Sequence, residues 1–304
     1  MKKAIVTGAT GALGTALIRE LIQHDVEVLV LARKGSARNG NIPKDPHVRV
    51  RDCSLDALGT LENDTDTPYD VFYHLAWEGT TGAARNDMRL QNRNVTYALD
   101  AVSAAVRMGC HTFIGAGSQA EYGRIEGILT PDTPTIPETG YGIGKLCAGL
   151  MTREVARGIG MRHVWVRVVS VFGPNDGEQS LVMSVIRALQ AGNAPKLTKG
   201  EQRWDYLYSA DAATAFRLLG ERGVDGKTYV LGSGQARPLS DYIRDIRDAI
   251  APDATLIFGE IPYAEKQVMH LEADISALTE DTGWKPQYSF REGLDALLRS
   301  LRER

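Results

Sequence analysis

The sequence predicts an α/β fold in which a doubly wound parallel sheet is followed by a smaller C-terminal α/β domain. Over the first 172 residues, short apolar runs alternate with amphipathic helical segments, as in chains of parallel β-α-β units. The first run, Ala4-Ile5-Val6, leads directly into a glycine-rich turn and then a helical pattern. Beyond Gly173-Pro174 this alternation ends. These observations indicate a Rossmann-type sheet in residues 1–172 and a smaller domain in residues 173–304.

Six strands are expected in the first domain, because six runs are apolar or alternate between apolar and polar residues. They are residues 4–6, 26–31, 48–51, 71–76, 112–115 and 163–168. Helical spacing predicts helices at 15–22 and 93–108, with Gly109 ending the second, and a further helix beginning at Tyr141.

The second half of the chain predicts helices at 181–189, 239–250 and 290–301. Two further strands, 204–208 and 228–231, flank a helix at 211–219. We expect the chain to return briefly to the first domain at about 203–232.

Composition excludes several classes of protein. A hydrophobic fraction of 43% and a charged fraction of 24% are ordinary for a globular chain with a substantial core. A net charge of −3 without a long basic run argues against nucleic acid as a partner. No apolar stretch approaches the ~18 residues of a membrane span, and the N-terminus leaves no room for a signal peptide.

The cysteines and histidines give no sign of a disulfide framework or a metal site. Cys53, Cys110 and Cys147 are scattered, so we expect reduced thiols and a cytoplasmic location. The six histidines show no metal-ligand spacing. His74 lies inside an apolar strand and is expected to be a satisfied core residue.

The turn after the first strand carries glycines at positions 8, 11 and 14. Glycine-rich turns occur in many α/β proteins, but the strand before this turn and the helix after it favour a dinucleotide site. Such a site needs backbone N–H groups and a helix N-terminus against a pyrophosphate. Residues 1–172 are therefore expected to bind a dinucleotide.

Tyr141 and Lys145 are four residues apart, so they share one face of a helix. A lysine beside a tyrosine stabilises the phenolate and lowers a pKa that starts near ~10. Gly142 and Gly144 lie in the same turn, although each disfavours a helix by about 1 kcal/mol relative to alanine. This suggests that a ligand approaches closely. A hydride carrier with a proton relay indicates a carbonyl/alcohol oxidoreductase.

These motifs, with Ser118 between them, resemble the extended short-chain dehydrogenase/reductase family, specifically its nucleotide-sugar branch. Segments similar to further family motifs follow in the family's order: Ala116–Gly123, Val168–Pro174, Arg203–Asp211, Ala273–Ser276 and Gly283–Pro286. The resemblance implies a dinucleotide-binding domain in residues 1–172 and a substrate-binding domain in residues 173–304.

The resemblance also implies roles for individual residues. Tyr141 would donate a proton to the substrate carbonyl, Lys145 would hold the nicotinamide ribose, and Ser118 would hydrogen-bond the same carbonyl oxygen. A core or capping role is the alternative for Ser118. The expected cofactor contacts are Gly8, Thr10, Gly11, Ala12, Leu13, Gly14, Arg33, Asp52, Leu75, Ala76, Lys145 and Val168. The expected substrate contacts are Trp77, Gln119, Glu121, Ser170 and Arg203.

Several positions depart from the family pattern. Sugar dehydratases of the family carry an acid pair where this chain has Gln119 and Ala120, which argues against a dehydratase. Glu121 replaces an apolar residue, and a surface or salt-bridged role is an alternative to substrate contact. Ser170 replaces an asparagine. Arg203 matches a diphosphate-binding arginine, and the nearest candidates for its usual partner are Lys266 and His270.

The end of the second strand predicts the cofactor. An acidic residue there would favour NAD, because it binds the adenosine ribose hydroxyls. This chain has Ala32, followed by Arg33 and Lys34, with Ser36 and Arg38 nearby. The small residue and the cations suit a 2′-phosphate, so NADP(H) is favoured and NAD is possible. The alternative is that these cations are solvated loop charges.

Three functions follow from these predictions. The first is NADPH-dependent reduction of a nucleotide-diphosphate 4-keto-6-deoxyhexose in deoxysugar biosynthesis. The second is a nucleotide-sugar 4-epimerase that retains NAD, and the third is a non-catalytic dinucleotide-sensing regulator. The helix at 93–108 and the helix from Tyr141 resemble the pair that forms a four-helix dimer interface in the family, so a homodimer is expected.

Overall fold

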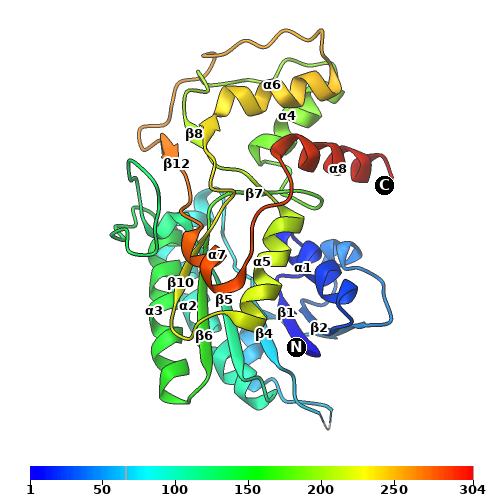
Figure 1. Ribbon diagram of the computed structural model, residues 1–304, viewed down its shortest axis with the longest axis vertical. Coiled ribbons are helices and arrows are strands. Elements are labelled where there is room, and N and C mark those ends of the chain that lie inside the picture. Colours follow the sequence, from blue (N-terminus) through cyan, green and yellow to red (C-terminus); the bar gives the residue numbers. More distant parts are fainter. Residues whose placement is uncertain (66, 304) are drawn as a thin grey trace.

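The computed structural model describes residues 1–65 and 67–303, and its centre is one seven-stranded sheet (Figure 1). Every neighbouring pair of strands is parallel. From one edge to the other the strands are β10 (Thr228–Leu231), β6 (Arg162–Val168), β5 (Thr112–Ser118), β4 (Val71–His74), β1 (Lys3–Thr7), β2 (Glu27–Ala32) and β3 (Val48–Asp52). The chain builds outward in both directions from β1 and β4, which confirms the predicted doubly wound fold.

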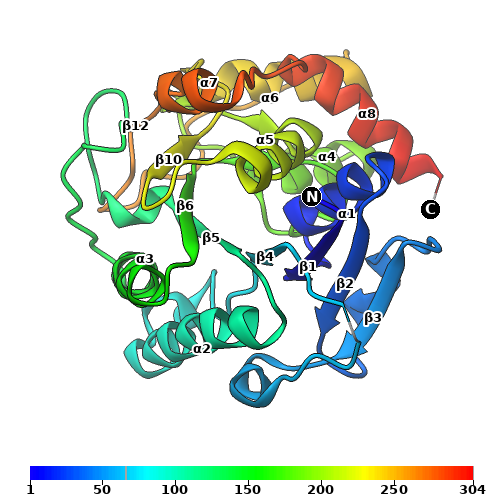
Figure 2. The same ribbon diagram turned by 60° about the horizontal axis from the view of Figure 1, so that its bottom comes forward.

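Helices cover both faces of the sheet (Figure 2). On one face, α1 (Ala12–Gln23) and α5 (Ser209–Arg222) bury leucine, isoleucine and alanine side chains in one apolar core. On the other, α2 (Met88–Arg107) and α3 (Gly140–Gly158) contribute to a second. Because the central strands are covered on both sides, they read as continuous apolar runs rather than alternating ones. His74 is buried beside Thr7 at 3.1 Å, confirming that it is a satisfied core residue.

α2 and α1 begin earlier than helical spacing predicts, and a side-chain cap sets the start of α2. α2 begins at Met88, five residues before the predicted Arg93, where the Asp87 carboxylate accepts the N–H groups of Arg89 and Leu90. α1 begins at Ala12 rather than Thr15. The first turn of α2 is largely exposed, so its residues carry no apolar periodicity.

Strand β5 runs three residues past its predicted end at Gly115. Glycines weaken a strand pattern, but here the side chain of Trp165 on neighbouring β6 lies across them. A Cβ at Gly115 would lie 2.3 Å from Trp165 Cζ3, and one at Gly117 would lie 2.4 Å from Trp165 Nε1. The extension carries Ser118 to the end of β5.

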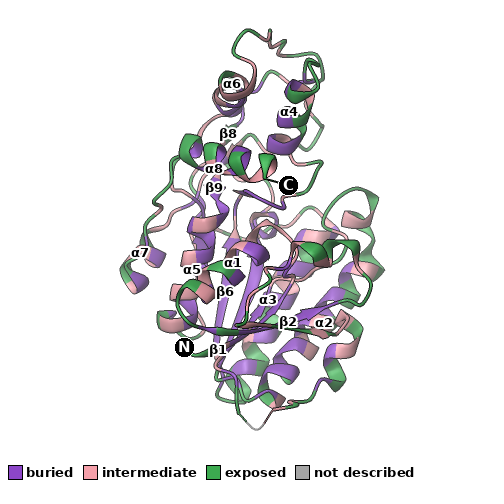
Figure 3. Ribbon diagram, turned by 90° about the vertical axis from the view of Figure 1, so that its right-hand side faces the viewer, coloured by how far each residue is buried: buried purple, intermediate pink, exposed green. Residues whose placement is uncertain are grey.

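The remaining chain forms a third apolar core away from the sheet. α4 (Leu181–Gln190), α6 (Leu239–Ile250) and α8 (Phe290–Arg302) enclose it. A small sheet of β11 (Arg237–Pro238), β8 (Arg203–Trp204) and β12 (His270–Leu271) lies beside these helices (Figure 1). Figure 3 shows buried residues concentrated on the sheet and on the helix faces toward each core.

The predicted strand at 204–208 is wrong, because the chain bends at Asp205. β8 ends at Trp204, and the next strand, β9 (Leu207–Tyr208), pairs instead with β7 (Val171–Phe172). Asp205 is completely buried, and its carboxylate accepts the N–H groups of Ser233, Gly234 and Ala273. These bonds hold the bend between two separate sheets.

The chain returns to the first sheet through α5 and β10, and it comes back once more near its end. α7 (Ser276–Thr282) and Trp284 pack against the core that α1 and α5 form. The indole N–H of Trp284 donates to the carbonyl oxygen of Asp211 at 3.0 Å. In the described part of the chain, no helix combines the length and the apolar character that crossing a membrane requires.

Candidate active site

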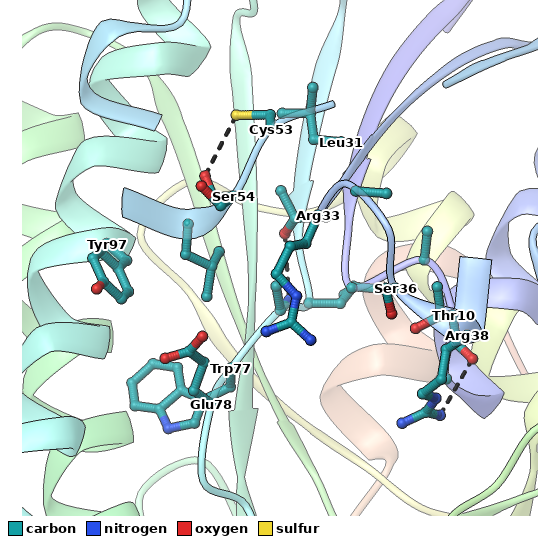
Figure 4. A pocket seen from close by; sticks show the side chains of 18 of the residues that line it. Thr10, Leu31, Arg33, Ser36, Arg38, Cys53, Ser54, Trp77, Glu78 and Tyr97 are labelled. Atoms are coloured by element: carbon teal, nitrogen blue, oxygen red, sulfur yellow. Dashed lines mark hydrogen bonds between the residues drawn. The ribbon is translucent and has the colours of Figure 1, made fainter. Parts of the chain in front are cut away.

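A cavity of about 720 Å³ opens at the carboxyl ends of β1, β2 and β4 (Figure 4). This is the point at which the strand order reverses, where open α/β sheets bind their ligands. Its walls come from four segments: Thr7–Gly11, Leu31–Arg33, Cys53–Asp56 and Leu75–Glu78.

The three glycines of the first turn serve different steric purposes. Gly8 has a φ of +73°, and a Cβ there would lie 2.6 Å from the backbone nitrogen of Ala76. A Cβ at Gly14 would lie 2.2 Å from the carbonyl oxygen of Gly8, so this glycine lets α1 pack onto the turn. A Cβ at Gly11 would meet only the tip of the Arg38 side chain, at 4.0 Å. Gly11 precedes α1 without a side-chain cap, which leaves free helical N–H groups beside open space.

The predicted cofactor residues fall into two groups. Those that line the cavity are Gly8, Thr10, Gly11, Arg33, Leu75 and Ala76. Ala12, Leu13 and Gly14 form the first turn of α1. Lys145 on α3 and Val168, which pairs with Ser118 at the end of β6, do not line the cavity. Asp52 is exposed at the end of β3 and does not line the cavity, whereas Cys53 to Asp56 do. β3 ends at Asp52, and the wall of the cavity is formed by the segment that follows this strand.

The end of β2 presents a small residue and a cation to the cavity. Ala32 is 7% exposed, and the side chain of Arg33 extends into the cavity (Figure 4). Ser36 and Arg38 line it further along. Arg38 donates to the carbonyl oxygens of Thr10 and Asn175, each at 3.3 Å, whereas Lys34 lies exposed outside it.

The structure brings Ser118 and Tyr141 together. Ser118 ends β5 and caps the short 3₁₀ helix η4 (Gln119–Glu121), with its Oγ accepting the N–H of Ala120 at 3.2 Å. It therefore has both the capping role and the predicted place beside the tyrosine. A hydrogen bond from Ser118 acts to lower the pKa of Tyr141.

Ser118 and Arg85 act to lower the pKa of Tyr141, but burial acts in the opposite direction and outweighs them, so this pKa lies above its usual value. Lys145 is buried, and its Nζ donates to the carbonyl oxygen of Ala116 at 2.6 Å. Burial also lowers the pKa of Lys145 to about 7.

Trp77 lies beside both Lys145 and Tyr141. The Nζ of Lys145 lies 4.0 Å from the centroid of its ring, and the ring of Tyr141 meets it edge-on at 6.2 Å. The indole N–H donates to Gln91 Oε1 at 2.7 Å, which fixes the ring. Trp77 also lines the cavity, so it connects the cofactor side with the Tyr141 side.

Glu121 does not reach a substrate, because η4 turns its side chain back beneath β5. The carboxylate is completely buried and accepts the N–H of Ser118 at 2.8 Å. It also accepts from Trp165 Nε1 at 3.0 Å and from Arg167 Nε at 2.8 Å. Glu121 therefore has the salt-bridged role in this structure and does not make the predicted substrate contact.

Of the other predicted substrate residues, Gln119 directly follows Ser118, whereas Ser170 contacts β8 and Arg203 belongs to it. Gln119 begins η4 and is partly buried. The Ser170 hydroxyl accepts from Trp204 Nε1 at 2.9 Å, and Arg203 Nη2 donates to the carbonyl oxygen of Ala236 at 2.5 Å.

The two candidate partners of Arg203 differ in position. Strand pairing places His270 opposite Arg203 in the small sheet. However, its Nε2 lies 2.9 Å from the carboxylate of Glu272, and its Nδ1 accepts the N–H of Gly127. Lys266 lies exposed in the preceding loop.

Sequence reasoning missed Arg85. Its guanidinium lies 4.3 Å from the centroid of the Tyr141 ring, yet the two residues are far apart in the sequence. Arg85 belongs to η3 (Ala83–Asn86), in a loop without periodicity. The sequence signal that could have identified Arg85 is a cation within the glycine-containing loop after β4.

Three features define the class of protein: the parallel sheet, the cavity where its strand order reverses, and the grouping of serine, tyrosine and lysine. These are the features of an extended short-chain dehydrogenase/reductase. Residues 4–232 match the model of the NAD dependent epimerase/dehydratase family. The chain therefore belongs to this family and is an NAD(P)-dependent enzyme.

Individual relatives are distant but cover much of the chain. CDP-abequose synthase from Salmonella typhimurium is 25% identical over 98% of this chain and 97% of its own. The dTDP-4-dehydro-6-deoxyglucose reductase of Escherichia coli is 24% identical over 64% of this chain and 62% of its own. The structure of a UDP-N-acetylglucosamine 4-epimerase from Methanobrevibacter ruminantium has a TM-score of 0.88 and 22% identity, covering 99% and 98% of the two chains. The last likeness concerns the fold alone.

Proposed function

We propose that this enzyme acts on a nucleotide sugar, and that it uses NADPH to reduce a nucleotide-diphosphate 4-keto-6-deoxyhexose. The observation that carries the reductase proposal is the end of β2, where Ala32 leaves space and Arg33 extends into the cavity. Two relatives support the substrate class, since one is named a CDP-abequose synthase and the other a dTDP-4-dehydro-6-deoxyglucose reductase. The absence of an acid pair at Gln119 and Ala120 favours reduction over dehydration.

The residues around the cavity fit a dinucleotide phosphate. Gly11 leaves open space above the uncapped start of α1, where a pyrophosphate can meet backbone N–H groups. Arg33 would bind a 2′-phosphate by charge-assisted hydrogen bonds, and Ser36 adds a hydroxyl donor on the same wall. When bound, the cofactor supplies a hydride to the carbonyl carbon.

The residues of the chain handle the proton. Tyr141 donates a proton to the carbonyl oxygen as negative charge develops there. The Ser118 hydroxyl, whose Oγ is already committed as an acceptor from Ala120, donates a hydrogen bond to the same oxygen. Lys145 would exchange its hydrogen bond to Ala116 for the ribose hydroxyls of the cofactor, and its Nζ lies over the ring of Trp77.

A nucleotide-sugar 4-epimerase is the second candidate. The likeness of the fold to a 4-epimerase and the family's description as NAD dependent favour it. An epimerase would use Ser118, Tyr141 and Lys145 for an oxidation and a reduction of one substrate, while retaining its NAD. Cofactor that remains bound through purification therefore discriminates between the two candidates. Turnover of either kind eliminates a non-catalytic regulator.

The protein is also proposed to be a homodimer. α3 exposes an apolar stripe on the side away from the sheet, and α2 packs beside it. The stripe consists of Ile143, Leu150, Met151, Val155 and Ile159, each 39–51% exposed. A second copy would cover this stripe, because contiguous exposed apolar surface marks an interface in soluble proteins.

The reductase proposal is tested by mixing the protein, NADPH and CDP- or dTDP-linked 4-keto-6-deoxy sugars and following the absorbance of NADPH. Oxidation that depends on the sugar is expected. No oxidation with any of these sugars, together with interconversion of 4-epimers by protein that carries bound NAD, would establish the epimerase instead.

A further inference from the structure

Arg85 lies face to face with the ring of Tyr141 and has no acidic partner. Its guanidinium carbon is 4.3 Å from the ring centroid. Within residues 1–65 and 67–303, its side chain makes one hydrogen bond, from Nη1 to the carbonyl oxygen of Thr80 at 2.7 Å, and no ion pair. A half-buried guanidinium without a carboxylate beside it is a charge available to the active site.

The loop that carries Arg85 is fixed against α3, so this contact does not depend on the side chain alone. The side chain of Asn86 accepts the N–H of Gly140 at 3.0 Å, at the start of α3. Gln91 donates to the carbonyl oxygen of Ala84 at 3.0 Å. A Cβ at Gly140 would lie 3.3 Å from the carbonyl oxygen of Arg85, so glycine permits this close approach.

Three charged groups surround Tyr141, and Arg85 is placed best to affect its phenol. Lys145 is 5.9 Å from the ring centroid, and its Nζ is engaged by Ala116. Glu121 lies behind Ser118 and opposes ionisation of the phenol, although Arg167 neutralises much of its charge. The uncharged neighbours Trp77 and Ser118 complete the surroundings.

We infer that Arg85 is a positioning residue for Tyr141. The guanidinium of Arg85 stabilises the phenolate that Tyr141 becomes when it donates its proton. A cation over an aromatic face is attracted more strongly when the ring gains negative charge. The charge of Arg85 also acts to lower the pKa of Tyr141. The inference rests on the proposed function only in taking Tyr141 as the proton donor.

The test measures ionisation of Tyr141 directly, without sugar and without turnover. 3,5-Difluorotyrosine is incorporated at position 141, where fluorination lowers the phenol pKa into a range that the fold tolerates, and ¹⁹F NMR follows its titration. Arg85→Gln removes the charge but keeps hydrogen-bonding capacity, and should raise the titration midpoint by about 1 pH unit. Arg85→Lys should restore at least half of this change. Arg89→Gln is the matched control, because Arg89 is exposed and lies four positions after Arg85 in the chain.

An unchanged midpoint in Arg85→Gln would overturn the inference, even if reductase activity fell, since Arg85 would then be a substrate contact only. If Arg85→Gln does not fold, Arg85→Met keeps the aliphatic stem and provides the same comparison. Failure of every sugar to react would leave this titration unaffected. The inference and the proposed function can therefore fail separately.

Discussion

The carboxylate of Glu121 accepts the backbone N–H of Ser118 at 2.8 Å, while the Ser118 hydroxyl accepts the N–H of Ala120. This capping box fixes a residue of the active site from beneath the sheet. The same carboxylate is paired with Arg167 on β6, so one buried ion pair connects the turn after β5 with the neighbouring strand. The serine is therefore held in place by a residue that does not itself reach the substrate.

Glu121→Gln should destabilise the protein strongly. It leaves the buried Arg167 without a counter-charge, and breaking a buried pair typically costs about 3 kcal/mol or more. Urea unfolding with circular dichroism measures the loss. Glu138→Gln, which breaks the surface pair with Arg124, is the control and should cost far less. Equal losses of unfolding free energy in the two variants would mean that the buried pair stabilises the fold no more than the surface pair does.

Replacing Lys145 should change how stability depends on pH. The pKa of Lys145 is about 7 in the folded protein, against ~10.4 for an unperturbed lysine. Between these values the unfolded chain binds more protons than the folded one, so stability rises with pH across this window. Below pH 7 the folded protein must bury the charge. Lys145→Met removes this cost and should stabilise the protein most at or below pH 7, while abolishing activity.

Thermal unfolding of Lys145→Met and wild type at a series of pH values checks this prediction. The difference in melting temperature should shrink as pH rises from about 7 toward about 10. A constant difference across that range would contradict the linkage, because it would come from packing alone. Thr152→Val provides a control substitution at a buried polar position of the same helix.

Ala32→Asp should reverse the preference for cofactor. A carboxylate at the end of β2 would repel a 2′-phosphate, so NADPH affinity should fall by roughly tenfold or more. NAD affinity should stay the same or improve, because the new carboxylate can bind ribose hydroxyls. Isothermal titration with each dinucleotide measures both. Lys34→Asp, outside the cavity, should change neither greatly, and an unaltered NADPH preference in Ala32→Asp would favour the epimerase.

Leu150→Arg should separate the proposed dimer. The new charge would lie in the middle of the apolar stripe of α3, where a partner copy would have to bury it. Light scattering should give the mass of a monomer for this variant and of a dimer for wild type. Val224→Arg changes an equally exposed apolar residue outside the stripe and should remain dimeric. A monomeric wild-type protein would refute the proposal.

Much of the fold could be predicted from the sequence because its signals are local. The apolar run before Gly8 and the four-residue spacing of Tyr141 and Lys145 depend only on neighbouring residues. The ends of helices were less predictable, because capping side chains such as Asp87 determine where a helix begins. The bend at Asp205 required knowledge of its distant partners Ser233 and Ala273.

The site was predictable in its motifs and not in its electrostatics. The direction in which Lys145 points depends on Ala116 and on the ring of Trp77, which no spacing rule connects. Arg85 reaches Tyr141 across 56 positions of sequence, and only the folded loop after β4 brings them together. Glu121 could be recognised as unusual, but its burial depends on the side chains of Trp165 and Arg167 on another strand.

Tyr141→Phe tests the central claim most directly, because it removes the transferable proton and leaves the ring against Arg85 and Trp77. The measurement is the rate of NADPH oxidation with a nucleotide-linked 4-keto-6-deoxy sugar, beside dinucleotide affinity and melting temperature for the same variant. We predict that turnover falls by ~10²–10⁴ while affinity and melting temperature stay near those of wild type. Near-normal turnover in Tyr141→Phe would contradict the account, because the proton would then come from another group.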